Sequence, residues 1–201
     1  MRRMCILLFL VLIPFLVSAD KKKDPQELFN EVKDEWILDE NGSITFSKVI
    51  EVNDIEKDEL YTRALSYFTY NYNSGDDVIQ VKDKEKGLII GKGIYANVYT
   101  GGTLAVSSFS IPHILRVDIK DSKIRVIITI QEYKVKVSGG KSLPSYPTFL
   151  VSQRFPFEKD FQKKIMCHVI YNTIQCVKNS FTSIEKSLKE GNTNSGENDD
   201  W

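Results

Sequence analysis

The residue types that most often carry catalysis are scarce and dispersed in this sequence. It contains only two histidines, His113 and His168, among 201 residues. A serine or cysteine hydrolase needs a base beside its nucleophile, and on a helix the neighbours Cys167 and His168 point about 100° apart. No Gly-x-Ser-x-Gly pattern of a nucleophile elbow occurs. Two dispersed histidines and two thiols on one helix do not form a metal site. The sequence therefore favours a protein that is not an enzyme and needs no cofactor or metal.

A glycine-rich segment at residues 87–93 invites comparison with a phosphate-binding loop. Its glycine spacing is one residue too short, no serine or threonine follows Lys92, and no helix pattern follows the segment. The pattern predicts a strand instead, whose glycines admit a bulge or the close approach of another part of the backbone.

Residues 46–93 form the stretch around which the other elements are organised. Apolar residues at three- and four-residue spacing predict a helix with one buried stripe, and Asn53 or Asp54 is expected to cap its start. β-rich segments flank this helix at residues 46–52 and 78–81, and a charged turn then leads into a third strand. The residues of the stripe are Leu60, Tyr61, Ala64, Leu65, Phe68 and Tyr72.

The runs KVIEV, KDELYTRALSYF and DVIQVKDKEKGLIIGKG in this stretch resemble the bacterial envelope family called domain of unknown function 4468. The resemblance rests on hydrophobic patterning and on Gly87, Gly91 and Gly93. It implies an α+β fold like that of the TATA-box-binding protein (TBP-like), ordered strand, helix, four strands, helix. The curved antiparallel sheet would carry its helices on one face. The family is typical of Bacteroidetes and has no assigned activity, so the resemblance supplies no catalytic residues.

The remainder of the domain is predicted to be β-rich, with a long helix at its end. Alternating residues at 113–119 and 124–137 predict two antiparallel strands with one face exposed to water. Residues 138–158 contain glycines, prolines and aromatic residues, and are expected to form a long loop. Residues 158–189 predict a helix with a wide apolar face that packs across a sheet.

Residues 1–19 have the features of a signal peptide. Arg2 and Arg3 give a positive start, an apolar run follows, and small residues precede a cleavage point after Ala19. The apolar run is shorter than the roughly 20 residues that a membrane span needs, which disfavours the alternative of an uncleaved anchor. We therefore expect a periplasmic or secreted protein that contacts the membrane only through its transient signal peptide.

The mature chain is predicted to divide into three parts. Residues 20–45 form a polar N-terminal lead-in with a short helix and a hairpin, and residues 46–190 form the TBP-like domain. Residues 191–201 are rich in Asn, Ser, Gly and Asp and are expected to be a disordered tail.

The charge balance disfavours nucleic acid as a partner. Removing Arg2 and Arg3 from the 27 basic residues leaves 25 against 27 acidic residues, so the mature chain carries a net charge of about −2. Such a chain has no general attraction to polyanions. Cys167 and Cys176 lie about 13 Å apart along a helix axis, too far for a disulfide between them, so they are expected to be buried thiols, with one intermolecular link as the alternative. We expect a monomer.

Binding remains as the expected function. The chain has more aromatic residues than one helix stripe requires, so some are candidates to line a groove between the open sheet face and the loop. The alternative is that they are core and sheet packing, because aromatic residues are enriched in strands. The candidate ligand face comprises Tyr95, Tyr99, Arg116, Tyr133, Tyr146 and Phe155. The sequence thus predicts an exported, non-enzymatic domain that binds a ligand or an envelope protein. The second hypothesis is a periplasmic hydrolase that uses carboxylates or His113 on the same open face.

Overall fold

The structure, a computed structural model, describes residues 23–36, 38–72, 78–139, 142–153 and 160–191. The predicted signal peptide with its cleavage point after Ala19, the candidate Phe155, and nearly all of the predicted tail lie outside these ranges. The elements follow in the order α1 (Pro25–Val32), β1 (Ile44–Glu51), α2 (Lys57–Asn71), β2 (Ile79–Asp83), β3 (Leu88–Gly101), β4 (Val106–Lys120), β5 (Lys123–Ile130), β6 (Glu132–Gly139), β7 (Ser142–Ser145), β8 (Thr148–Leu150), the 3-10 helix η1 (Val151–Gln153) and α4 (Asp160–Glu190).

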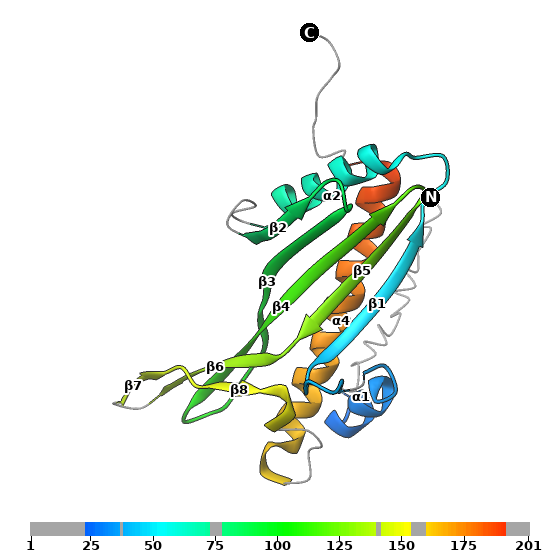
Figure 1. The fold of residues 1–201 in the computed structure, drawn as a ribbon. Coiled ribbons are helices and arrows are strands. Elements are labelled where there is room, and N and C mark those ends of the chain that lie inside the picture. The colour runs from blue at the N-terminus through cyan, green and yellow to red at the C-terminus, as the bar shows by residue number, and fades with distance from the viewer. Residues whose placement is uncertain (1–22, 37, 73–77, 140–141, 154–159, 192–201) are drawn as a thin grey trace, which may run out of the picture.

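A curved antiparallel sheet forms the frame of the molecule (Figure 1). Its strand order is β1-β5-β4-β3-β2. The long strand β4 pairs with β5 through residues 114–120 and with β6 through residues 106–110, so the sheet continues into a ribbon of β6, β7 and β8. In β3 the register shifts between Tyr95 and Tyr99, and Asn97 there has a positive φ of 51°. Such bulges bend a strand.

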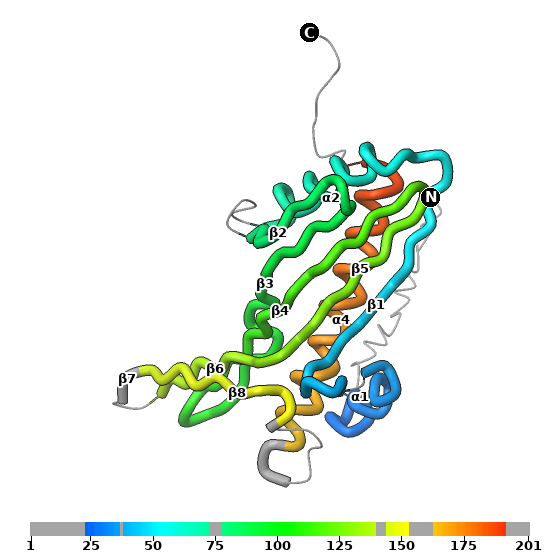
Figure 2. Tube along the Cα trace, in the orientation of Figure 1, coloured from blue at the N-terminus to red at the C-terminus, as the bar shows by residue number. Residues whose placement is uncertain are grey.

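The helices α2 and α4 cover one face of this sheet. Figure 2 shows α4 crossing the sheet along its length, with α2 across the C-terminal end of α4. The strands bury alternate side chains toward the helices, which is the pattern of a sheet with one covered face. Fully buried examples are Ile50 of β1, Ile89 of β3, Leu115 of β4 and Ile124 of β5. The predicted α+β fold with helices on one face is confirmed.

Two glycines let α2 lie close to β3. A Cβ added to Gly91 would lie 2.5 Å from Cε1 of Phe68, and one added to Gly93 would lie 2.5 Å from Cε1 of Tyr72. Real Cβ atoms do not approach carbon this closely, so both positions require glycine. The segment that superficially resembled a phosphate loop forms a strand, as the sequence predicted. At Gly91 and Gly93 the close neighbours are the side chains of Phe68 and Tyr72 rather than another part of the backbone.

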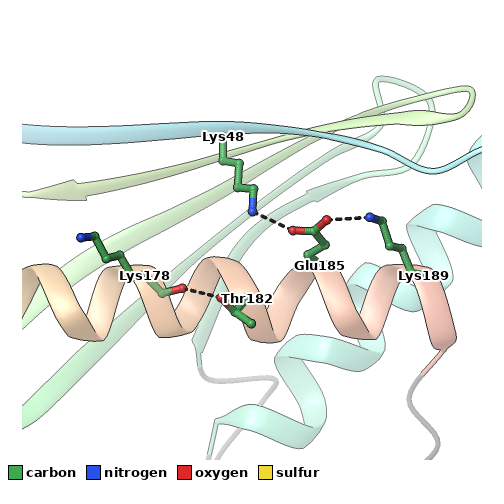
Figure 3. Close-up of polar contacts among 5 residues, drawn as sticks. All are labelled: Lys48, Lys178, Thr182, Glu185 and Lys189. Atoms are coloured by element: carbon green, nitrogen blue, oxygen red, sulfur yellow. Dashed lines mark hydrogen bonds and ion pairs between the residues drawn. The ribbon is translucent and has the colours of Figure 1, made fainter. Parts of the chain in front are cut away.

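Polar contacts hold α4 to its neighbours. The Arg63 guanidinium of α2 donates to the carbonyls of Leu188 (2.8 Å) and Lys189 (3.1 Å). Both carbonyls belong to the last turn of α4, where backbone acceptors have no partner within the helix. Figure 3 shows Glu185 of α4 accepting hydrogen bonds from Lys48 of β1 and from Lys189, both at 2.6 Å. These contacts join the last turns of α4 to both α2 and the edge strand.

Several predicted details are wrong. The helix α2 begins after Glu56, which makes no side-chain capping bond, rather than after a capping Asn53 or Asp54. The segment predicted as a loop at residues 138–158 contains β7, β8 and η1. The glycines and prolines of this segment favour a loop. Its short strands form because β6 pairs with them, and a pairing partner elsewhere in the chain leaves no periodic signal within the segment itself. Of the predicted lead-in hairpin, the described residues show an antiparallel bridge between Leu38 and Ile44, and Ile37 lies outside the described ranges.

Candidate functional site

The structure does not bring the predicted ligand-face residues together. Tyr95, Tyr99 and Tyr133 lie on the covered face of the sheet. The Tyr95 hydroxyl is 2.9 Å from Ser180 Oγ of α4, the Tyr99 ring stacks on His168 of α4, and Tyr133 is buried. Their expected position on an open aromatic face is therefore wrong. The rings of Tyr95 and Tyr99 pack against α4, and the ring of Tyr133 packs against Phe109 and Phe149, which is the alternative that the sequence left open.

The other described candidates lie at separate places. Arg116 lies on the uncovered face, where it and Arg125 both donate hydrogen bonds to Asp118 (2.9 and 2.8 Å). Burial would raise the pKa of Asp118, but the two guanidinium groups outweigh it and hold that pKa below its usual value. Tyr146 lies between β7 and β8 and is 68% exposed. The uncovered face thus presents an ion-paired carboxylate that stays ionised and is not suited to act as a general acid.

A buried cluster of aromatic and polar side chains lies between the sheet and the two helices. His113 of β4 stacks on Tyr95 of β3 with ring centroids 4.0 Å apart, and its Nε2 is 3.3 Å from the hydroxyl of Tyr72. Burial lowers the pKa of His113 to about 4, against a small opposing effect of the Ile111 backbone. Burial also raises the pKa of the Tyr72 and Tyr95 hydroxyls. All three groups are therefore neutral near pH 7.

This cluster has the residue types of a catalytic site, but its histidine is buried and a substrate cannot reach it from solvent. His113 is 4% exposed and shares the inward parity of Ile111 and Leu115 along β4. The second hypothesis placed His113 on the open face, and that placement is wrong because strand alternation turns its side chain toward the helices. Among the described groups that shift the pKa values of Tyr72, Tyr95 and His113 there is no carboxylate. The geometry fits a packed polar core.

A pocket of about 470 Å³ lies at the other end of the covered face. Its lining residues come from the β3–β4 hairpin, from β4, β6 and β8, and from the first turns of α4. Its floor is formed by buried side chains, namely Phe109, Tyr133, Val135 and Met166. Leu104 at the hairpin tip is 92% exposed and marks the mouth. This volume is within the range of small-molecule sites.

The pocket lining is apolar. Among the lining residues that the structure describes, none carries a charged side chain, and the aliphatic hydroxyls are those of Thr103 and Ser107. Of the predicted ligand residues only Tyr133 lines it. The sequence contained a signal for the pocket in the alternation of Tyr133, Val135 and Val137 along β6. That signal alone does not distinguish a pocket wall from ordinary core.

Other site types find little support in the described part of the chain. No group of three or more His, Cys, Asp or Glu side chains is gathered there as a metal ion requires. Cys167 and Cys176 are free thiols whose pKa values are raised by burial. None of the described helices is long and apolar enough to cross a membrane.

Comparison with known families gives a match to the central part of the chain. Residues 46–134 match the family described as a domain of unknown function (DUF4468) with TBP-like fold. This segment carries the DUF4468 pattern. The resemblance predicted from the sequence is thereby confirmed. The match includes the buried cluster but ends early in β6, before β8 and the turns of α4 that complete the pocket. Among curated proteins, none matches this chain.

Two solved structures share the fold. A TBP-like protein from Parabacteroides distasonis ATCC 8503 is 14% identical, with a TM-score of 0.53 over 74% of this chain and 96% of that chain. A DUF4468 family protein from Bacteroides ovatus ATCC 8483 is 13% identical, with a TM-score of 0.54 over 83% of this chain and 96% of that chain. At these identities the likeness shows the TBP-like fold and no activity, because one fold hosts many functions.

Proposed function

We propose that this protein is an exported, non-enzymatic binding domain whose site is the apolar pocket between the β3–β4 hairpin, the β6–β8 ribbon and α4. The observation that carries the proposal is the pocket itself, about 470 Å³ in volume with buried Tyr133 and Met166 in its floor. An apolar cavity with few polar groups is typical of a ligand site.

The absence of catalytic geometry within the described residues supports binding over hydrolysis. His113 is enclosed beneath the helices, and Asp118 on the uncovered face is engaged by two arginines. Neither group combines access with a pKa near neutrality, which efficient acid–base catalysis requires. The export part of the proposal rests on the N-terminal features alone. Under the proposal, the protein acts in the periplasm or outside the cell, and it acts as a monomer.

Native mass spectrometry of the protein, expressed in its own host from the full coding sequence, tests the proposal. We expect a bound species in addition to the chain, and a chain mass that corresponds to cleavage after Ala19. The decisive variant is Val137→Phe, which adds volume from the pocket wall. Val106→Phe is the matched control, because Val106 is 37% exposed and does not line the pocket.

The outcomes separate clearly. Loss of the bound species in Val137→Phe but not in Val106→Phe supports the pocket as the binding site. A bare chain mass in the wild type, or a bound species that survives Val137→Phe, contradicts it. A chain mass that retains residues 1–19 contradicts export by signal-peptide cleavage.

A further inference from the structure

We propose, on the basis of that binding function, that the ligand of the pocket is an uncharged small molecule composed mainly of hydrocarbon. The inference specifies the chemical class: it excludes charged ligands, and it excludes a peptide added as a strand beside β6. It rests on three properties of the described lining: its lack of charge, the positions of its hydroxyl groups, and the pairing of the strands that form its wall.

The charge of the ligand follows from the lining. The described lining residues offer no cation to a carboxylate or phosphate and no anion to an amine. A charge moved from water into such a site without a partner carries a large desolvation cost. A free fatty acid or a phosphate ester would therefore have to keep its charged group outside the mouth, near the exposed Leu104. A neutral molecule enters without this cost.

The polar groups of the pocket allow one short polar end on the ligand. Ser107 of β4 is paired in register with Val137 of β6, so its hydroxyl lies on the pocket side of the sheet. Thr103 belongs to the hairpin that forms the mouth. A hydroxyl or carbonyl group on the ligand has partners at these two positions, while the floor formed by Phe109, Val135 and Met166 contacts hydrocarbon.

The strand pairing argues against an extended peptide as occupant. A peptide that adds to a sheet needs a free strand edge, whose backbone groups supply most of the affinity. The pocket wall strand β6 is paired with β4 on one side and with β7 and β8 on the other. Within the described ribbon both edges of β6 are therefore occupied, so an extended peptide cannot add to this wall strand.

Two fluorescent probes with the same ring system test whether the pocket prefers an uncharged ligand. N-phenyl-1-naphthylamine is neutral, and 8-anilinonaphthalene-1-sulfonate carries a sulfonate. Each is titrated into the purified protein, delipidated beforehand. We expect the neutral probe to bind at least about tenfold more tightly, because the sulfonate would be desolvated without a cation. Equal affinity, tighter binding of the sulfonate, or no binding of the neutral probe overturns the inference.

Pocket-filling variants localise the probe. Val137→Phe is expected to weaken the neutral probe about tenfold or more, whereas Val106→Phe on the opposite face leaves its affinity unchanged. Near-ultraviolet circular dichroism reports whether each variant is folded. If Val137→Phe is not, Ser107→Phe fills the same pocket from β4. A neutral-probe affinity that is insensitive to the folded pocket variant overturns the inference.

The identity of the species in the native spectrum separates this inference from the function on which it rests. A charged molecule or a peptide that is lost in Val137→Phe would confirm binding at the pocket and overturn the proposed ligand class. A neutral hydrocarbon-rich molecule lost in that variant supports both.

Discussion

The two ends of the covered sheet face differ in what fills them. At one end, α2 and α4 together enclose Tyr72, Tyr95 and His113, and the rings touch at distances such as 4.0 Å. At the other end, among the described helices, the first turns of α4 lie beside the ribbon, and a pocket of about 470 Å³ is present. The groups capable of acid–base chemistry are buried where a second helix is present, and the accessible space has an apolar lining. The described part of the molecule therefore has its pocket at the end that α2 does not cover, and its buried polar cluster at the end that both helices cover.

The largest expected effect tests whether the two ends differ in packing. Phe68→Ala, at a fully buried ring of α2, should reduce the free energy of unfolding by about 4 kcal/mol. Phe149→Ala at the half-buried pocket wall should cost less than half of that, because part of its ring is already in contact with water. Urea denaturation followed by circular dichroism measures both. Equal losses would remove the contrast between the two ends.

The pH dependence of stability reports how closed the cluster is. The pKa of His113 is lowered from 6.5 to about 4, so between these values the unfolded chain binds more protons than the folded chain. Stability contributed by neutral His113 is present above pH 6.5 and is lost as the pH falls toward 4, by up to about 3 kcal/mol. His113→Phe should flatten the curve of unfolding free energy in this window. An unchanged slope in the variant would mean that His113 is accessible to protons in the fold.

Gly93→Ala tests the close approach of α2 to β3. The added Cβ would lie 2.5 Å from Tyr72 and 2.6 Å from His113 Nε2, so we expect a loss of about 2 kcal/mol in the free energy of unfolding. Ile94→Ala is the neighbouring control, since Ile94 is 52% exposed on the other face and should cost less than about 1 kcal/mol. Comparable midpoints for the two variants would show that α2 can shift to accept a side chain.

The smallest expected effect concerns Glu185 of α4, which pairs with Lys48 of β1 and, within the helix, with Lys189. Hydrogen bonds from Lys189 and Lys48 lower the pKa of Glu185 from 4.5 to about 2. The stabilisation from these bonds is fully present above pH 4.5, and it is lost as the pH falls from 4.5 toward 2. The side chain is 29% exposed, so solvent screens the pairs and Glu185→Gln should cost only about 0.5 kcal/mol near neutral pH. Glu190→Gln, whose partner Lys186 is 3.9 Å away, should have no measurable effect on the thermal midpoint. A loss above about 2 kcal/mol for Glu185→Gln would mean that the pairs are shielded from water.

Local patterns in the sequence were sufficient for most of the fold and for little of the site. The helix stripe that includes Leu60 and Phe68, the alternation of β4, and the strand that contains Gly91 and Gly93 were all predictable, because each is a local signal within one segment. The pocket was not. Its walls come from hairpin, ribbon and helix segments that are distant in the chain, and Val135 has the same alternation whether it faces a helix or a cavity.

The sequence by itself determined the organisation of this protein: a strand, a helix and a run of strands closed by a long helix, with the candidate export signal at its start. Hydrophobic periodicity and glycine placement act through residues that are neighbours in the chain, so they predict the helices and strands from the sequence alone. Only the tertiary structure decided that Tyr95 and His113 are enclosed, that Arg116 is paired on the uncovered face, and that Tyr133 borders a cavity. Access to solvent depends on which elements cover a residue, and the pattern within one strand does not report which helix will lie over it.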